Sequence, residues 1–185
     1  RVPKVLDDGR RNGIYCTGLE HKMGINGSAT CFMSLEDAEG YLIGEPHQGL
    51  RYMFSMMNSA RLMVGVQGLG LGEAAYQTAV KFARERIQGR SLAGTQSPDQ
   101  AADSILVHPD VRRMLLSQKA LLQGGRALAC WVGINLDISH YHPDPHQREQ
   151  AHDQVELLTP IVKAFLTDQG YRVCDLAMQT LGGSG

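Results

Sequence analysis

The chain has 185 residues and a formal net charge of −1, and 43% of its residues are hydrophobic. This length predicts one domain or slightly more, with enough apolar residues for an ordinary core. A nearly neutral chain has no overall attraction for nucleic acid or for anionic membranes, so we expect neither as a partner. No apolar run approaches the roughly 20 residues of a membrane span, and no targeting pattern is visible.

Residues 1–46 predict short strands joined by turns. The stretches SATCFMSL (residues 28–35) and GYLIGEP (residues 40–46) alternate in polarity and lie next to glycines, which is typical of strands. After Pro46 the composition becomes helical. We therefore expect a domain boundary there, with residues 1–46 as the remnant of a β-domain and residues 47–185 as a helical domain.

Residues 49–90 carry apolar side chains at helical spacing. At about 1.5 Å per residue, this stretch predicts a helix on the order of 60 Å long, which suits a bundle rather than a small globule. Gly89 is expected to end the helix, because glycine favours the position just beyond a helix C-terminus.

The rest of the chain predicts a loop and three further helices. Residues 91–104 have loop composition, and Pro109 after His108 opens a second long helix. A third helix is expected over residues 147–158. Thr159 and Pro160 are interpreted as the cap and first residue of a fourth, which runs to Leu181. The fold class is therefore mainly α: an up-down helical bundle preceded by a few β-strands from a truncated β-domain. The apolar stripe expected on the second helix comprises Val111, Leu115, Leu122, Leu128, Trp131 and Ile134.

The glycine-rich stretch GVQGLGLGEAA (residues 65–75) raises the question of a nucleotide site. Gly70, Gly72 and Ala75 loosely match a dinucleotide-binding fingerprint, which requires a preceding strand and an acidic residue about twenty positions further on. The preceding residues have a helical pattern, and Thr95 occupies the acidic position. We therefore interpret these glycines as small residues that let helix backbones approach closely. The alternative is that they let a flat ligand lie against the helix.

Two groups of polar side chains interrupt or end the first helix. Asn58 and Arg61 lie three residues apart in an apolar run, hence on one helix face, where a guanidinium needs a partner. That partner is either an internal carboxylate or a ligand. Arg84, Arg86 and Arg90 form a cationic run that is either a solvated helix end or a phosphate site, since arginine binds phosphate oxygens bidentately.

Cysteine and histidine are the remaining candidates for special chemistry. The cysteines are widely spaced, which favours buried free thiols in a reducing cytoplasm. The segment HYHPDPH (residues 140–146) is interpreted as a solvated loop between helices, with a metal-binding site as the alternative. We expect no metal, and no catalytic triad stands out. The cysteines are Cys16, Cys31, Cys130 and Cys174, and the loop histidines are His140, His142 and His146.

Four segments together resemble the acyl-CoA dehydrogenase family of flavoproteins. EHKMGINGSAT (residues 20–30) resembles a late segment of the family's β-domain, and SLEDAEGYLIGEPHQGL (residues 34–50) resembles the strand that leaves it. The helical stretch of residues 58–90 resembles the first bundle helix, and AMQTLGGSG (residues 177–185) resembles a Gln-x-Leu-Gly-Gly turn. The resemblance covers nearly the whole chain and implies FAD-dependent α,β-dehydrogenation of an acyl-CoA thioester.

The family resemblance also implies site residues. Substrate contacts are expected from Asn58, Ser59, Ala60 and Arg61, and from Ser28 toward the CoA moiety. Contacts with FAD, across a dimer interface, are expected from Arg86, Ile87, Gln88, His108, Pro109, Gln179, Thr180, Leu181, Gly182 and Gly183. One feature departs from the family, because the segment IQG after Arg86 is one residue shorter and lacks the usual Phe.

The same resemblance implies that the catalytic glutamate lies beyond Gly185, so the chain alone is expected to be inactive. It implies acyl-CoA as substrate, an electron-transfer flavoprotein as acceptor, and a cytoplasmic homodimer or dimer of dimers. The long connection over residues 138–160 resembles the larger bacterial branch that includes methylthiopropanoyl-CoA dehydrogenases. Two alternatives remain, a free-standing helical interaction module without cofactor and a metal-binding protein that uses the histidine loop.

Overall fold

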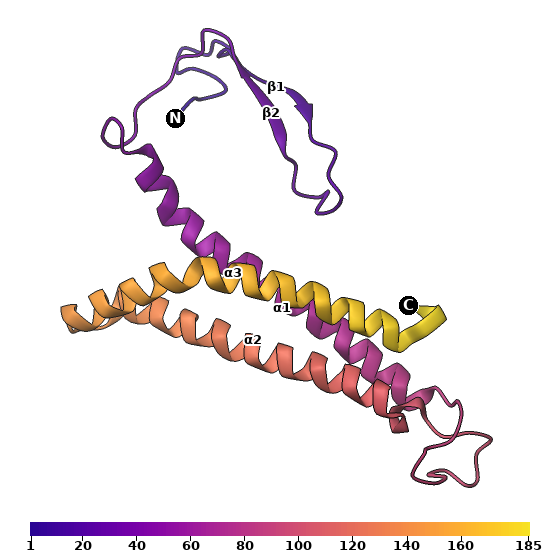
Figure 1. Ribbon diagram of the computed structural model, residues 1–185. Helices are drawn as coiled ribbons and strands as arrows, with labels where there is room; N and C mark the ends of the chain where they lie inside the picture. The colour runs from indigo at the N-terminus through magenta and orange to yellow at the C-terminus, as the bar shows by residue number, and fades with distance from the viewer. The chain divides into compact units, whose positions relative to one another are not determined.

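A computed structural model describes residues 1–185, apart from the side chain of Ser55. Contacts divide the chain into two compact units, Arg1–Met53 and Phe54–Gly185. The predicted mainly α fold is confirmed, and within the described residues no helix combines the length and apolar character that a membrane crossing requires. The elements in chain order are β1 (Ile14–Leu19), β2 (Cys31–Leu35), α1 (Gly49–Glu85), the 3-10 helix η1 (Ile105–Val107), α2 (Pro109–Tyr141), α3 (Pro145–Leu181) and the 3-10 helix η2 (Gly182–Ser184) (Figure 1).

The first unit is an antiparallel hairpin of β1 and β2, with Ile14 opposite Leu35. The buried side-chain amide of Asn12 links the segments before β1 and after β2, because its Nδ2 group donates to the carbonyls of Pro3 and Glu39 at 2.7 and 2.8 Å. The strand predicted within residues 28–35 is thus confirmed, whereas the one predicted over 40–46 is wrong. There Gly44 has a φ of +78°, which turns the chain out of an extended conformation.

The cysteines were expected to be buried, and this prediction is wrong. Cys16, Cys31 and Cys130 are exposed and Cys174 is half-buried, although all four thiols are free. The hairpin thiols lie on a two-stranded ribbon, which has too little area to cover its own side chains. A side-chain hydrogen bond with Cys16 raises the pKa of Cys31.

In the second unit, α1 and α3 cross with almost touching backbones. A Cβ atom on Gly170 would lie 2.5 Å from the carbonyl oxygen of Gly68, and one on Gly68 would lie 2.9 Å from that of Leu166. Such approaches are possible only for residues without a side chain. The whole stretch of residues 65–75 is helical, so close packing explains these glycines and the dinucleotide fingerprint has no strand to lead it.

Two clusters of buried apolar side chains hold the three helices together. One joins α1, η1, α2 and α3 at the start of α2, and the other lies further along α2, against the middle of α3. Within the predicted α2 stripe, Leu115 and Leu122 are buried, but Trp131 and Ile134 are 49% and 58% exposed. The described part of the chain thus covers a narrower face of α2 than the one on which apolar residues occur. The first cluster contains Ala79, Ala83, Ile105, Leu115 and Ala177, and the second contains Val132, Val162 and Leu166.

The helix break predicted at Thr159 and Pro160 is wrong, since α3 runs through both residues without interruption. Thr159 is buried, and its hydroxyl donates to the carbonyl of Val155 at 2.6 Å. Pro160 is exposed, so its ring meets solvent rather than a neighbouring helix. A proline inside a helix costs about 3 kcal/mol, and burial of the face that carries Thr159 and Val162 offsets that cost.

Candidate functional site

The segment after α1 is hydrogen-bonded to the segment that leads into α2. The amide of Ile105 donates to the carbonyl of Arg86 at 2.9 Å, and Ile87 pairs with Ser104 as an antiparallel bridge. This pairing explains why α1 ends at Glu85 rather than at the predicted Gly89. The amide of Arg86 still donates to the carbonyl of Phe82 at 2.8 Å, whereas the amide of Gln88 donates to the carbonyl of Asp103 at 2.9 Å. The two stretches are thereby fixed to each other.

His108 completes this junction. Its ring nitrogen Nε2 lies 2.7 Å from the carbonyl oxygen of Gln88, and since a carbonyl can only accept, the histidine donates. His108 is also the N-cap residue of α2, with Pro109 at the first helical position. The structure thus brings together two predicted sets, residues 86–88 and residues 108–109, which are far apart in the sequence.

The third predicted set, residues 179–183, lies at the end of α3. Ala177, just before it, packs in the same cluster as Ile105 and Leu115. The set therefore lies at the same end of the helical unit as the start of α2, as the yellow end of α3 in Figure 1 illustrates. Gly182 has a φ of +60°, and a Cβ atom on it or on Gly183 would meet nothing within 4 Å. The backbone is consequently open to a flat group. We call residues 86–88, 108–109 and 179–183 the loop end.

The three arginines of the predicted cationic run differ in their surroundings. Arg90 is used within the following loop, where its Nη2 donates to the carbonyl of Gln100 at 2.6 Å and its Nη1 to that of Ser97 at 3.0 Å. Arg84 and Arg86 are exposed. Among the described side chains, none pairs with the guanidinium of Arg84 or Arg86. Arg86 is therefore a cation available to an anionic ligand at the loop end.

The loop between residues 90 and 103 is organised by the carboxylate of Asp103, which is fully buried. Its Oδ2 accepts from the amide of Ser91 at 2.9 Å, and its Oδ1 accepts from the amides of Gln96 and Ser97 at 3.0 and 2.7 Å. The hydrogen bond from Ser91, with those from Ser97 and Gln96 and the charge of Arg90, lowers the pKa of Asp103 despite its burial. The sequence predicted this segment only as a loop, because a turn-like composition does not indicate that one of its carboxylates is buried.

The predicted substrate residues lie elsewhere on α1. Asn58 and Arg61 are half-buried, whereas Ser59 and Ala60 are exposed. The guanidinium carbon of Arg61 lies 5.4 Å from the ring centre of Phe54, so among the described residues an aromatic face replaces the expected carboxylate. Arg86 directly follows the end of α1 and lies about 25 residues beyond Arg61, or about 37 Å at the helical rise. The predicted substrate residues are thus far from the loop end.

Ser28 belongs to the first unit, in the connection between β1 and β2. Its amide donates to the carbonyl of Ile25 at 3.1 Å, and its own carbonyl accepts from the ammonium group of Lys22. The side chain is exposed.

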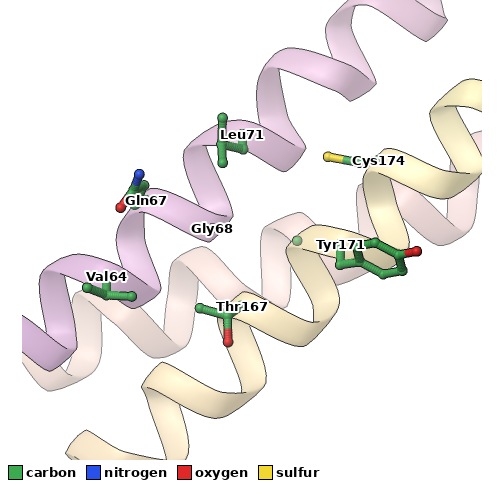
Figure 2. A pocket seen from close by; sticks show the side chains of 8 residues that line it. Val64, Gln67, Gly68, Leu71, Thr167, Tyr171 and Cys174 are labelled. Atoms are coloured by element: carbon green, nitrogen blue, oxygen red, sulfur yellow. The ribbon is translucent and has the colours of Figure 1, made fainter. Parts of the chain in front are cut away.

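A pocket of about 310 Å³ lies between α1 and α3, beside the glycine crossing. Figure 2 shows Val64, Gln67 and Leu71 on α1 facing Thr167 and Cys174 on α3, with Tyr171 at the edge. The hydroxyl of Thr167 is already bonded to the carbonyls of Lys163 and Ala164. The pocket is therefore a mainly apolar groove whose lining contains no carboxylate, histidine or lysine, and it contains none of the predicted site residues.

The histidine loop shows no metal centre. Each histidine bonds locally, for example His140 Nδ1 with the carbonyl of Leu136 at 2.8 Å and His146 Nε2 with the side-chain Nε2 of Gln150 at 3.1 Å. Within the part of the chain that the structure describes, no three His, Cys, Asp or Glu side chains lie together as metal ligands would.

Comparison with known proteins agrees with this arrangement. Residues 47–185 match the family model described as acyl-CoA dehydrogenase, C-terminal domain. The chain is 47% identical over 189 residues to 3-methylmercaptopropionyl-CoA dehydrogenase of Ruegeria pomeroyi. It is 37% identical over 200 residues to the broad-specificity linear acyl-CoA dehydrogenase FadE5 of Mycobacterium tuberculosis. Each alignment covers 100% of this chain and 32% of the relative.

Solved structures give the same fold. Butyryl-CoA dehydrogenase from Megasphaera elsdenii superposes with a TM-score of 0.71 at 22% identity, over 92% of this chain and 39% of that one. The chain thus spans about a third of the length of the curated relatives it matches. The predicted resemblance, including that to the methylthiopropanoyl-CoA branch, is confirmed by the first of these relatives. This chain belongs to the acyl-CoA dehydrogenase family.

Proposed function

We propose that the chain is part of an FAD-dependent acyl-CoA dehydrogenase, which removes hydrogen from the α and β carbons of an acyl-CoA thioester. The observation that carries the proposal is the loop end, where three separated segments lie at the same end of the helical unit and Arg86 has no partner among the described side chains. When bound, the flavin accepts the hydride from the β-carbon. The residues of this chain bind and orient the cofactor and the substrate.

The chemistry of the loop end fits a dinucleotide such as FAD. A phosphate needs a cation or aligned donors, and Arg86 has a guanidinium with no partner among the described side chains. A flat adenine needs open backbone, and Gly182 and Gly183 have space where a side chain would stand. We propose that Ile87, Gln88, His108 and Pro109 form the rest of this contact, with Gln179, Thr180 and Leu181.

We propose that the substrate contacts residues 58–61, in the first half of α1. Asn58 supplies an amide and Arg61 a guanidinium held over the ring of Phe54. Ser59 and Ala60 are exposed beside them and Ser28 is exposed in the first unit. Support for an acyl-CoA substrate comes from the names of the relatives, which are dehydrogenases of 3-methylmercaptopropionyl-CoA and of linear acyl-CoA.

The base that removes the α-proton is proposed to lie outside these residues. The pocket between α1 and α3 contains no carboxylate, and a general base must reach the proton it abstracts. We expect no dye reduction by the isolated chain with added FAD and a panel of acyl-CoA thioesters. Turnover clearly above the buffer rate would place the base within this chain and contradict the proposal.

The partners are proposed on the same basis. One structural relative comes from work on an electron-transferring flavoprotein of Acidaminococcus fermentans, which supports such a protein as the electron acceptor. We also propose a cytoplasmic homodimer or dimer of dimers, with the loop end against FAD of the neighbouring subunit. Exposed apolar side chains on α2 and α3, such as Trp131 and Leu157, support an association of subunits.

The proposed reaction is tested on the full-length enzyme that contains this chain. The purified enzyme is expected to bind FAD, and anaerobic addition of 3-methylmercaptopropionyl-CoA or butyryl-CoA should bleach the flavin absorbance near 450 nm by roughly the fraction of sites occupied. A protein that retains no flavin, or a bound flavin that no acyl-CoA bleaches, would overturn the proposed function.

A further inference from the structure

Asp103 stands out because it combines full burial with a charge. Of the residues that the structure describes, it is the one charged residue in the buried class. Burial of a charge is unfavourable unless the charge is paired and hydrogen-bonded. Here the carboxylate receives three backbone amides and, at 3.4 Å, the Nη1 of Arg90. These hydrogen bonds to the carboxylate fix the loop of residues 90–103 in one conformation.

The backbone of Asp103 is joined directly to the loop end. Its amide donates to the carbonyl of Gly89, and its carbonyl accepts from the amide of Gln88, both at 2.9 Å. The next residue, Ser104, pairs with Ile87, and its hydroxyl donates to the carbonyl of Ala83 at 2.6 Å. Residues 103–105 thus pair with residues 86–88 in a strand-like manner. The carboxylate of Asp103 fixes the loop that leads into this pairing.

The position of Gln88 matters for His108 as well. The carbonyl of Gln88 receives the His108 ring, while the amide of the same residue donates to Asp103. The peptide groups on either side of Gln88 are thus held from two directions. Loss of the carboxylate would release the amides of Ser91, Gln96 and Ser97 together. Residues 103–105, which pair with residues 86–88, would then no longer be held in place by the loop.

We propose that Asp103 is a positioning residue for FAD, which holds the loop of residues 90–103 closed so that Arg86 and Gln88 are presented correctly. The inference rests on the proposed function, because it concerns the same loop end. Asp103 does not touch the cofactor in this account. It acts through residues 86–88.

The test first compares three variants of the full-length enzyme by FAD affinity, measured by fluorescence titration of the apoenzyme. Asp103→Ala is expected to raise the Kd for FAD about 10- to 100-fold, because one or two contacts of the cofactor lose their geometry. Asp103→Asn keeps Oδ1 for Gln96 and Ser97 but turns a donor toward the amide of Ser91, so a partial effect is expected. Asp99→Ala, an exposed aspartate of the same loop, is the matched control and should change the Kd less than about twofold.

A double variant separates positioning from general stability. If Asp103 acts through Arg86, then Arg86→Ala combined with Asp103→Ala should weaken FAD binding no more than the worse single change, since both remove one contact. Hydrogen exchange should show faster exchange of the Ser91, Gln96 and Ser97 amides in Asp103→Ala, with the centres of α2 and α3 unchanged. If Asp103→Ala does not fold, the same comparison is made with Asp103→Asn.

The outcomes separate the two proposals. Additive losses in the double variant, or normal FAD affinity in Asp103→Ala together with weak binding in Arg86→Ala, would overturn the positioning role alone. A wild-type enzyme that does not bind FAD would overturn the proposed function instead. A non-additive loss, with Asp99→Ala unaffected, supports both.

Discussion

Arg84 and Arg86 stand two residues apart at the end of α1, and both are exposed and cationic. Only Arg86 belongs to the segment that pairs with residues 103–105. A cation near a helix C-terminus is favoured by the helix dipole, which explains the composition of both positions without a ligand. The surroundings of Arg86, rather than its charge, make it the candidate for cofactor binding.

In the full-length enzyme, Arg86→Ala is expected to raise the Kd for FAD by a factor on the order of 10 to 100, since a charge-assisted hydrogen bond contributes about 1.5–3 kcal/mol. Arg86→Lys should recover only part of the affinity, because an ammonium cannot form the same two-pronged contact. Arg84→Ala is the control and should have little effect. Equal losses for Arg84 and Arg86 in a fluorescence titration would mean a solvated cationic surface rather than a site.

The lowered pKa of Asp103 predicts a pH dependence of stability. A carboxyl group with a lower pKa in the folded than in the unfolded state stabilises the fold above its unfolded pKa, about 4, and that contribution is lost as the pH falls through the folded pKa. The difference in unfolding free energy between the wild-type chain and Asp103→Ala should therefore be constant between about pH 8 and pH 5 and shrink below about pH 4. Urea unfolding at three pH values measures it, and a difference that grows on acidification would contradict this cause.

At the scale of elements, periodicity predicted the long helices because apolar spacing reports directly on a buried helix face. It did not predict where those helices end. Glu85 ends α1 because residues 86–88 pair with a segment distant in sequence, and Thr159 lies inside α3 because its side chain is buried against other helices. Both outcomes depend on tertiary contacts that no local pattern encodes. The same holds for Asp103, whose burial could not be seen in a loop of polar composition.

The crossing of α1 and α3 depends on Gly68, whose neighbour Gly70 offers a matched control on the same helix. A Cβ atom on Gly68 would press on the Leu166 carbonyl, whereas one on Gly70 would meet nothing within 4 Å. Gly68→Ala should therefore lower the unfolding free energy of the chain by about 1–3 kcal/mol. Gly70→Ala should leave it unchanged or raise it by up to about 1 kcal/mol. Thermal unfolding of both variants checks this, and a Gly68→Ala variant as stable as wild type would mean that the helices cross at a greater distance.

Pro160 is expected to be a local weakness of α3. It has no N–H to donate to the carbonyl four residues earlier, and its exposed ring makes no compensating buried contact. Pro160→Ala should stabilise the chain by about 1–3 kcal/mol, measured by urea unfolding. Destabilisation would indicate that the local geometry imposed by Pro160 is needed for packing, while Pro98→Ala in the exposed loop serves as a control with little effect.

For the molecule as a whole, composition and charge predicted a core of ordinary size, and residue patterns predicted the family. Neither predicted which apolar side chains stay exposed. Trp131 and Ile134 on α2 are apolar, but the described residues leave both side chains exposed. Sequence patterns report the apolar face of a helix and not the number of partners that cover it. The convergence of residues 86–88, 108–109 and 179–183 likewise required the fold, because these sets are separated by long helices.

We propose that FAD binds at the end of the helical unit that carries residues 86–88, 108–109 and 179–183. A crystal structure of the full-length enzyme with FAD tests it most directly. We expect the guanidinium of Arg86 at about 2.7–3.2 Å from a pyrophosphate oxygen, with the backbone of Gly182 and Gly183 against the adenine end of a cofactor held by the neighbouring subunit. FAD bound elsewhere, with Arg86 in solvent and the Gly182–Gly183 turn free of cofactor, would contradict it.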